Sequence, residues 1–331
     1  MTSSNDEATM MRIKELLIPP SDFASDQANR RFAEIRSQRP PYYAAIEQGD
    51  ITKIRQVWDE YETLPALEKA RTIYPVKVES TEIGGIRAEI VTPVEGPAPE
   101  NDGKILINLH GGGFIAGSYG RALLEAVPIA SVGRILVATL DYRLAPEHVF
   151  PAASKDIAAA YRQLIADYRP ENIGIYGCSA GGTLSAEAVA WLQGDGLPRP
   201  GAIAMICSNA ARMGTGDSMQ LGRALGLVVP QAPKLRWYFD GTDPNDPLVS
   251  PCASLDVLRS FPPTLLISAT RDFFLSHTTH FHLQLVKAGI EAQLCIWDGL
   301  WHGFVWSTDL PESVEAYQII VDFFGRHLGR P

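Results

Sequence analysis

The spacing of apolar residues changes near residue 73, where helix-like periodicity gives way to strand-like runs. Within residues 52–70, apolar side chains recur at intervals of three and four, which predicts an amphipathic helix. Beyond this point, short apolar runs predict strands at residues 76–80, 86–92, 104–109 and 134–142. The later strands alternate with helical patterns, so we expect an α/β fold: a mostly parallel sheet with helices on both faces and an antiparallel edge made by the first strands.

The same pattern divides the chain into three parts. Residues 1–72 are helix-like, and residues 73–208 and 249–331 carry the alternating α/β pattern. Residues 209–248 are polar, glycine-rich and aromatic, without strand character. We therefore expect one large α/β domain, with the N-terminal helices and the 209–248 insertion joining as a helical cap.

Composition and charge argue against some classes of binding partner. The chain has 331 residues, a hydrophobic fraction of 46% and a charged fraction of 20%, as expected for a globular protein. Its net charge of −9 and its lack of a long basic run argue against nucleic acid as a partner. The charged first twenty residues do not resemble a secretory signal, and no apolar stretch approaches a membrane span, so we expect a cytoplasmic protein without a membrane partner. The four cysteines lack paired spacing and are expected to be reduced.

A candidate nucleophile lies in the segment Gly177-Cys178-Ser179-Ala180-Gly181. An apolar strand-like run precedes this Gly-x-Ser-x-Gly pattern and a helical run follows it, which is the context that a nucleophile elbow requires. Glycines on both sides permit a turn too sharp for bulky neighbours, and the turn exposes the serine oxygen. The start of the following helix directs backbone N–H groups toward a developing oxyanion.

A second glycine-rich segment, residues 110–113, directly follows the apolar run 105–109 and reads His-Gly-Gly-Gly. A tetrahedral intermediate in acyl transfer carries a negative oxygen that needs two or three N–H donors. Three glycines let the backbone approach that oxygen without interference from side chains, so this segment is the candidate oxyanion loop.

The candidate base and acid follow the serine. His302 lies next to Gly303 after the strand-like run 292–297, where it can reach across to the nucleophile. Asp272 follows the apolar run 264–271, at the strand end where an orienting carboxylate is needed. Asp298 is the rival acid, but it stands only four residues before His302 and is interpreted as a turn residue at the end of a strand. We favour Asp272.

Four segments together resemble the hormone-sensitive-lipase-like esterases, or bacterial lipase family IV: residues 110–114, 141–148, 177–182 and 301–304. The resemblance covers about residues 75–325. It implies an α/β-hydrolase fold with a helical cap, and a triad of Ser179, Asp272 and His302. It also implies an oxyanion hole made by the N–H groups of Gly112, Gly113 and Ala180. Many members carry Asp, Glu or Thr before the nucleophile, whereas this chain has Cys178.

The expected activity is that of a serine carboxylesterase acting on small or medium acyl esters through an acyl-enzyme. Neither a metal nor an organic cofactor is required, and the spacing of His277, His280 and His282 does not match a helical zinc site. The resemblance suggests a possible homodimer. Two alternatives remain: hydrolysis of amides, carbamates or lactones by the same triad, and a non-catalytic small-molecule receptor. The presence of His302 argues against the receptor. The segment 141–148 is interpreted as a structural brace for the glycine loop.

Overall fold

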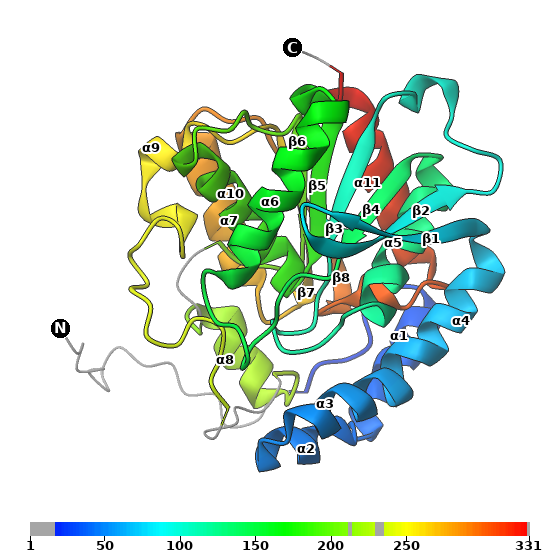
Figure 1. Ribbon diagram of the computed structural model, residues 1–331. Coiled ribbons are helices and arrows are strands. Elements are labelled where there is room, and N and C mark those ends of the chain that lie inside the picture. Colours follow the sequence, from blue (N-terminus) through cyan, green and yellow to red (C-terminus); the bar gives the residue numbers. More distant parts are fainter. Residues whose placement is uncertain (1–16, 211–213, 229–234, 330–331) are drawn as a thin grey trace.

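An eight-stranded sheet forms the centre of the computed structural model, which describes residues 17–210, 214–228 and 235–329 (Figure 1). The strand order is β1-β2-β4-β3-β5-β6-β7-β8. In chain order the strands are β1 (Val76–Ile83), β2 (Ile86–Pro93), β3 (Ile105–Leu109), β4 (Leu136–Leu140), β5 (Ile173–Cys178), β6 (Ala202–Ile206), β7 (Thr264–Arg271) and β8 (Ala292–Trp301). β2 pairs antiparallel with β1 and β4, and the other neighbours are parallel. The predicted α/β fold with an antiparallel edge is confirmed.

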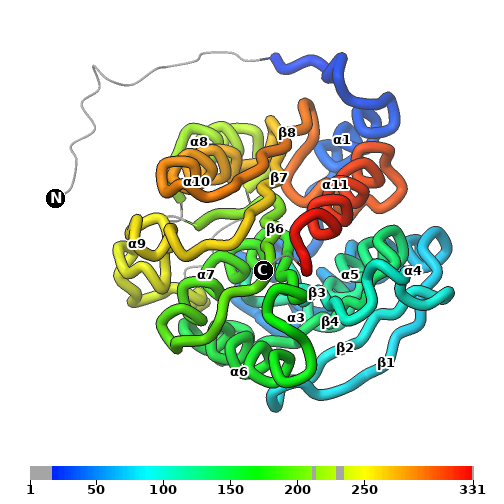
Figure 2. The backbone as a smooth tube through the Cα atoms, turned by 90° about the horizontal axis from the view of Figure 1, so that it is seen from above, coloured from blue at the N-terminus to red at the C-terminus, as the bar shows by residue number. Residues whose placement is uncertain are grey.

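Helices cover both faces of the sheet (Figure 2). α5 (Gly120–Gly133) and α11 (Pro311–His327) share a buried apolar cluster with strand residues such as Leu106. On the opposite face, α6 (Ala152–Asp167), α7 (Ala180–Gly194) and α10 (Leu275–Lys287) pack in a second cluster that contains Ile105 and Ile107. Successive side chains of a strand point to opposite faces, so a single buried strand supplies both clusters.

The N-terminal helices lie together along one side of the sheet and appear in blue in Figure 1. They are α1 (Asp26–Ser37), α2 (Tyr42–Gln48), α3 (Ile51–Trp58) and α4 (Leu64–Ile73), with a π-helical turn over Asp59–Thr63 between the last two. The helix predicted over residues 52–70 is thus confirmed as a continuous stretch that contains one π-turn.

Arg55 of α3 attaches these helices to the loops that follow β3 and β4. Its guanidinium donates to the carbonyl oxygens of Ile115, at 2.7 Å, and Ala145, at 3.0 Å. It also donates to both carboxylate oxygens of Glu147, at 2.9 and 2.7 Å. Because a bidentate Arg–carboxylate pair fixes orientation as well as distance, Arg55 holds α3 in register with the two loops.

The segment that the sequence assigns to an insertion contains α8 (Asp217–Ala224), and its described residues include no strand. Arg36 at the end of α1 donates a hydrogen bond to the carbonyl of Leu225, just after α8. This contact joins the N-terminal helices to the insertion. The remaining short elements are α9 (Leu255–Leu258) and 3-10 turns at Pro99–Asn101, Pro170–Asn172, Pro251–Ala253 and Phe304–Trp306.

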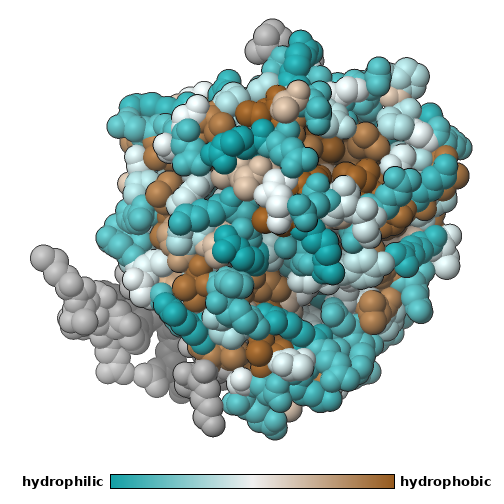
Figure 3. Space-filling view, in the orientation of Figure 1, coloured by the Kyte–Doolittle hydropathy of each residue, from teal (hydrophilic) through white to brown (hydrophobic). Residues whose placement is uncertain are grey.

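The surface drawn in Figure 3 is a mixture of polar and apolar side chains, in which polar residues interrupt the apolar patches. Such mixing is ordinary for a folded domain, since apolar atoms make up much of any protein surface. Of the helices in the described part of the chain, none combines the length and the apolar character needed to cross a bilayer.

Candidate active site

Ser179 occupies a sharp turn between β5, which ends at Cys178, and α7, which begins at Ala180. Its backbone has φ 57° and ψ −117°, an unfavourable region for a residue with a side chain. A Cβ on Gly177 or Gly181 would lie 2.1 or 1.6 Å from the carbonyl oxygen of Leu109. Both glycines are therefore required because β3 passes in backbone contact with the turn, as the elbow pattern predicts.

The three predicted triad side chains meet at the carboxyl ends of β5, β7 and β8. Nε2 of His302 lies 2.9 Å from Oγ of Ser179, and its Nδ1 lies 2.8 Å from Oδ1 of Asp272. Asp272 directly follows β7 and His302 directly follows β8, and these two strands are neighbours in the sheet. The three side chains are thus connected in one hydrogen-bonded line, the arrangement that a nucleophile, a base and an orienting acid require.

The carboxylate of Asp272 is buried and held from three directions. Besides the His302 contact, Oδ1 accepts a hydrogen bond from the backbone N–H of Phe274 at 2.9 Å, and Oδ2 accepts one from Ser268 Oγ at 2.7 Å. Burial alone would raise the pKa of Asp272, but the His302 ring and these hydrogen bonds hold it below its usual range. The group therefore stays ionised and can stabilise a protonated His302.

The rival acid, Asp298, is exposed and does not join this line. Its carboxylate accepts a hydrogen bond from Ser21 Oγ, in the segment that precedes α1. The interpretation of Asp298 as a strand-end turn residue is wrong, because β8 continues through it to Trp301. The structure nevertheless brings Asp272, not Asp298, to His302.

The glycine loop, residues 110–113, lies against the serine turn, residues 177–181. A Cβ on Gly111 would lie 2.9 Å from the carbonyl oxygen of Cys178, so the two backbones touch. Gly112 and Gly113 have φ values of 127° and 63°, and a Cβ on Gly112 would lie 2.1 Å from the oxygen of Ala116. Only glycine allows this loop to fold back on itself beside Ser179.

The segment 141–148 braces the glycine loop, as the sequence predicts. Tyr142 Oη donates to the carbonyl oxygen of His110 at 2.6 Å, and the two rings stack with centroids 4.3 Å apart. Arg143, the next residue, forms an ion pair with Asp156 at 2.7 Å on α6. These contacts connect the start of the glycine loop to the helix layer beyond it.

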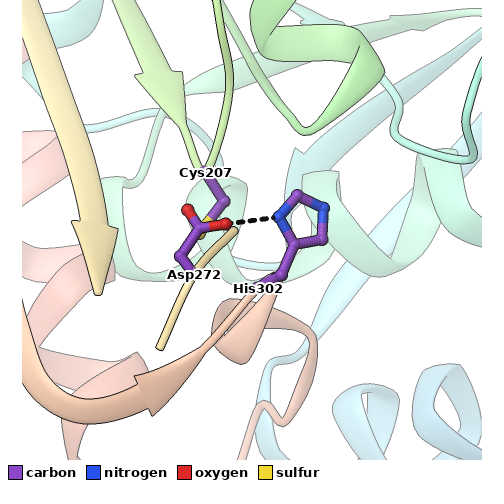
Figure 4. A group of neighbouring side chains, drawn as sticks. All are labelled: Cys207, Asp272 and His302. Atoms are coloured by element: carbon purple, nitrogen blue, oxygen red, sulfur yellow. Dashed lines mark hydrogen bonds and ion pairs between the residues drawn. The ribbon is translucent and has the colours of Figure 1, made fainter. Parts of the chain in front are cut away.

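Cys207, at the end of β6, completes the buried surroundings of the acid (Figure 4). One potential ligand atom from each of Cys207, Asp272 and His302 lies within 4.8 Å of the others, the closest approach to a metal-binding group among the described residues. The Asp272 and His302 side chains are already engaged with each other, so a metal ion here would compete with that hydrogen bond. Cys178 and Cys207 are both free thiols, as the sequence predicts.

Sequence reasoning missed one residue at this site, Glu125 on α5. Its carboxylate accepts hydrogen bonds from the backbone N–H of Gly111 at 2.9 Å and of Cys178 at 3.2 Å. The available signal was a single glutamate within the apolar helical run 122–130, where a buried charge needs a local reason.

Comparison with known proteins identifies the family of this chain. Residues 106–306 match the family described as alpha/beta hydrolase fold. An acetyl-hydrolase of Streptomyces hygroscopicus is 31% identical and is aligned over 72% of this chain and 79% of its own. An esterase of Acinetobacter venetianus is 25% identical over 78% of this chain and 86% of its own.

Solved structures give the same result. One esterase crystal structure superposes with a TM-score of 0.85 at 29% identity, covering 96% of this chain and 99% of its own. An esterase from the bacterial hormone-sensitive lipase family superposes with a TM-score of 0.75 at 26% identity, covering 92% and 99%. Each of these two structural likenesses extends over more than nine-tenths of this chain.

Proposed function

This chain belongs to the α/β-hydrolase family as a hormone-sensitive-lipase-like carboxylesterase, and we propose that it hydrolyses short- to medium-chain acyl esters through an acyl-enzyme on Ser179. The observation that carries this proposal is the line of hydrogen bonds from Ser179 to His302 and on to Asp272, at 2.9 and 2.8 Å. No other assignment of roles uses both contacts.

In the first step, Oγ of Ser179 attacks the ester carbonyl while Nε2 of His302 takes its proton. The Asp272 carboxylate keeps the ring in the tautomer that leaves Nε2 free to accept, and it stabilises the imidazolium that forms. His302 then gives the proton to the departing alcohol. Water repeats the sequence on the acyl-enzyme and releases the acid.

The negative oxygen of each tetrahedral intermediate is stabilised by the N–H groups of Gly112, Gly113 and Ala180. Ala180 is the first residue of α7, whose leading N–H groups have no partner within the helix. The contact between the glycine loop and the serine turn supports this assignment, since it places both sources of donors beside Ser179.

The range of acyl chains that the enzyme accepts depends on the N-terminal helices and the 209–248 insertion. We infer that α1–α4 and residues 209–248 together form a cap, with the catalytic domain made by residues 73–208 and 249–331. The contacts of Arg55 with the β3 and β4 loops and of Arg36 with Leu225 support this division. A cap held this way limits the length of acyl chain, and the likeness to an acetyl-hydrolase favours short chains.

Hydrolysis of a p-nitrophenyl ester series, acetate to laurate, by wild type and Ser179→Ala tests the proposal. We expect serine-dependent turnover that is highest for short chains. Removing a triad nucleophile leaves only weak residual catalysis, so the variant should lose at least about 10,000-fold in kcat. Retained activity in a folded Ser179→Ala variant would refute the nucleophile. A maximum at long chains would refute the restrictive cap, and turnover only of amides or lactones would refute the ester substrate class.

A further inference from the structure

A single buried carboxylate lies beneath both loops of the proposed oxyanion hole. Glu125 is in the interior of α5 and is 7% exposed. Its Oε1 accepts from the Gly111 backbone N–H at 2.9 Å and from Trp306 Nε1 at 3.0 Å. Its Oε2 accepts from the Cys178 backbone N–H and from Asn108 Nδ2, both at 3.2 Å. Four N–H donors therefore converge on one side chain.

Two of these donors are the immediate neighbours of the proposed catalytic groups. Gly111 precedes Gly112 in the glycine loop, and Cys178 precedes Ser179 in the turn. The two oxygens of one carboxyl group have a constant separation, so they set the distance between the two backbones they bind. The residue directly before Ser179 is Cys178, whose side chain is a free thiol, so this residue supplies no carboxylate beside the turn.

We propose that Glu125 is a positioning residue that holds the glycine loop and the serine turn at the spacing that stabilises the oxyanion. The inference rests on the proposed function, because it concerns the same oxyanion. Glu125 acts through Gly111 and Cys178 and does not touch the substrate. Its effect should therefore appear in the transition state rather than in substrate binding.

An ionised carboxylate is the side chain that fits four N–H donors. Each oxygen accepts two hydrogen bonds. All four partners are N–H donors, so a proton on either oxygen would find no acceptor among them. A glutamine has the same shape but only one accepting atom, so its NH2 group would face two donors. Burial raises the pKa of Glu125 to about 7, opposed by the hydrogen bonds from Gly111, Trp306 and Asn108 and by Arg121, so the carboxylate form that these donors require predominates above pH 7.

Neighbouring side chains fix Glu125 in place. The Arg121 guanidinium stacks 4.0 Å from the centre of the Trp306 ring and donates to Glu62 at 2.8 Å, in the π-turn between α3 and α4. A Cβ on Gly111 would lie 2.8 Å from Trp306 Cζ2 and 3.2 Å from Glu125 Oε1. The carboxylate and the indole therefore pack closely against the glycine loop at Gly111.

The test compares Glu125→Gln with Glu187→Gln. Glu187 is also fully buried, but it lies on α7 with its Oε2 accepting from Ser154 at 3.3 Å, and none of its hydrogen bonds reaches the glycine loop. Each variant changes a buried carboxyl into an amide, so effects common to that change cancel. The measurements are kcat and KM for p-nitrophenyl acetate, corrected for the fraction of sites labelled by a fluorophosphonate.

A third measurement is the inhibition constant of a trifluoromethyl ketone, because its serine adduct places an oxyanion in the hole. For Glu125→Gln we expect kcat per active site to fall about 10- to 100-fold, KM to change less than about 2-fold, and the inhibition constant to rise by the same factor as kcat falls. Glu187→Gln should leave all three values unchanged.

Wild-type kcat and ketone affinity per labelled site in Glu125→Gln would overturn the inference, even if the melting temperature fell, because the residue would then be only structural. If Glu125→Gln does not fold, Trp306→Phe removes one of the four donors and keeps the carboxylate. It should lower kcat and ketone affinity together by about 3- to 10-fold, and unchanged values would equally overturn the inference. Failure of the proposed function can be distinguished from failure of this inference, since it would appear as turnover that persists in Ser179→Ala.

Discussion

Replacing Asp272 by asparagine removes the charge that stabilises a protonated His302 but leaves a hydrogen-bond acceptor in place. The His302 ring and the Phe274 N–H both approach Oδ1, whereas Oδ2 receives the rotatable hydroxyl of Ser268. The asparagine oxygen is therefore favoured at the Oδ1 position, with its NH2 group donating to Ser268. This orientation preserves the ring tautomer, so the loss should come mainly from the missing charge.

The size of that loss follows from the 2.8 Å contact between Asp272 and His302. At this separation, and with an effective dielectric constant of about 20, a carboxylate and an imidazolium attract by about 6 kcal/mol. A factor of ten in rate corresponds to about 1.4 kcal/mol, so complete loss would slow the reaction about 10,000-fold. The retained hydrogen bond offsets part of this, and we expect kcat/KM to fall about 1,000- to 10,000-fold.

The assay is hydrolysis of p-nitrophenyl acetate by folded protein, with Asp298→Asn as the matched control. Asp298 is an exposed carboxylate four residues before His302, and its contact is with Ser21. The control should keep kcat/KM within about 2-fold of wild type, since a substitution at an exposed position away from the triad contacts rarely changes the stability of the fold. If Asp272→Asn kept more than a tenth of the activity, or if Asp298→Asn were the crippling change, the choice of acid would be wrong.

Two further predictions concern stability. Gly181→Ala places a Cβ 1.6 Å from the backbone oxygen of Leu109, which cannot rotate away, and should destabilise the fold by about 3 kcal/mol or more. Gly194→Ala, at the other end of α7, meets no atom within 4 Å and should raise the melting temperature slightly in the same thermal scan. Equal melting temperatures for the two would contradict the tight β3 contact. Burial raises the pKa of Glu187 well above its usual range, so the folded state binds an extra proton and stability falls as pH rises above the ordinary glutamate pKa. Glu187→Gln, which cannot ionise, should therefore melt higher than wild type at pH 8 but not at pH 4, and a pH-independent difference would exclude this explanation.

The order of elements and the identity of the triad candidates could be predicted from the sequence because both depend on local patterns. The alternation of strands and helices follows from the spacing of apolar residues, and it is confirmed by the order of elements along the chain. Ser179 lies within its own glycine pattern, and His302 and Asp272 each follow an apolar run. In a parallel sheet such runs end at the same edge, so the sequence also predicted where the three residues would meet.

Other contacts between distant segments could not be predicted from the sequence. The sequence favoured Asp272 over Asp298, but only the fold shows that one contacts His302 and the other contacts Ser21. No sequence motif marks Glu125, because its role depends on four hydrogen-bond donors from separate segments. These segments are the end of β3, the glycine loop, the serine turn and the turn after β8. Periodicity along a chain records which face of an element is buried, whereas the partner of a buried charge is decided by the way those faces pack together.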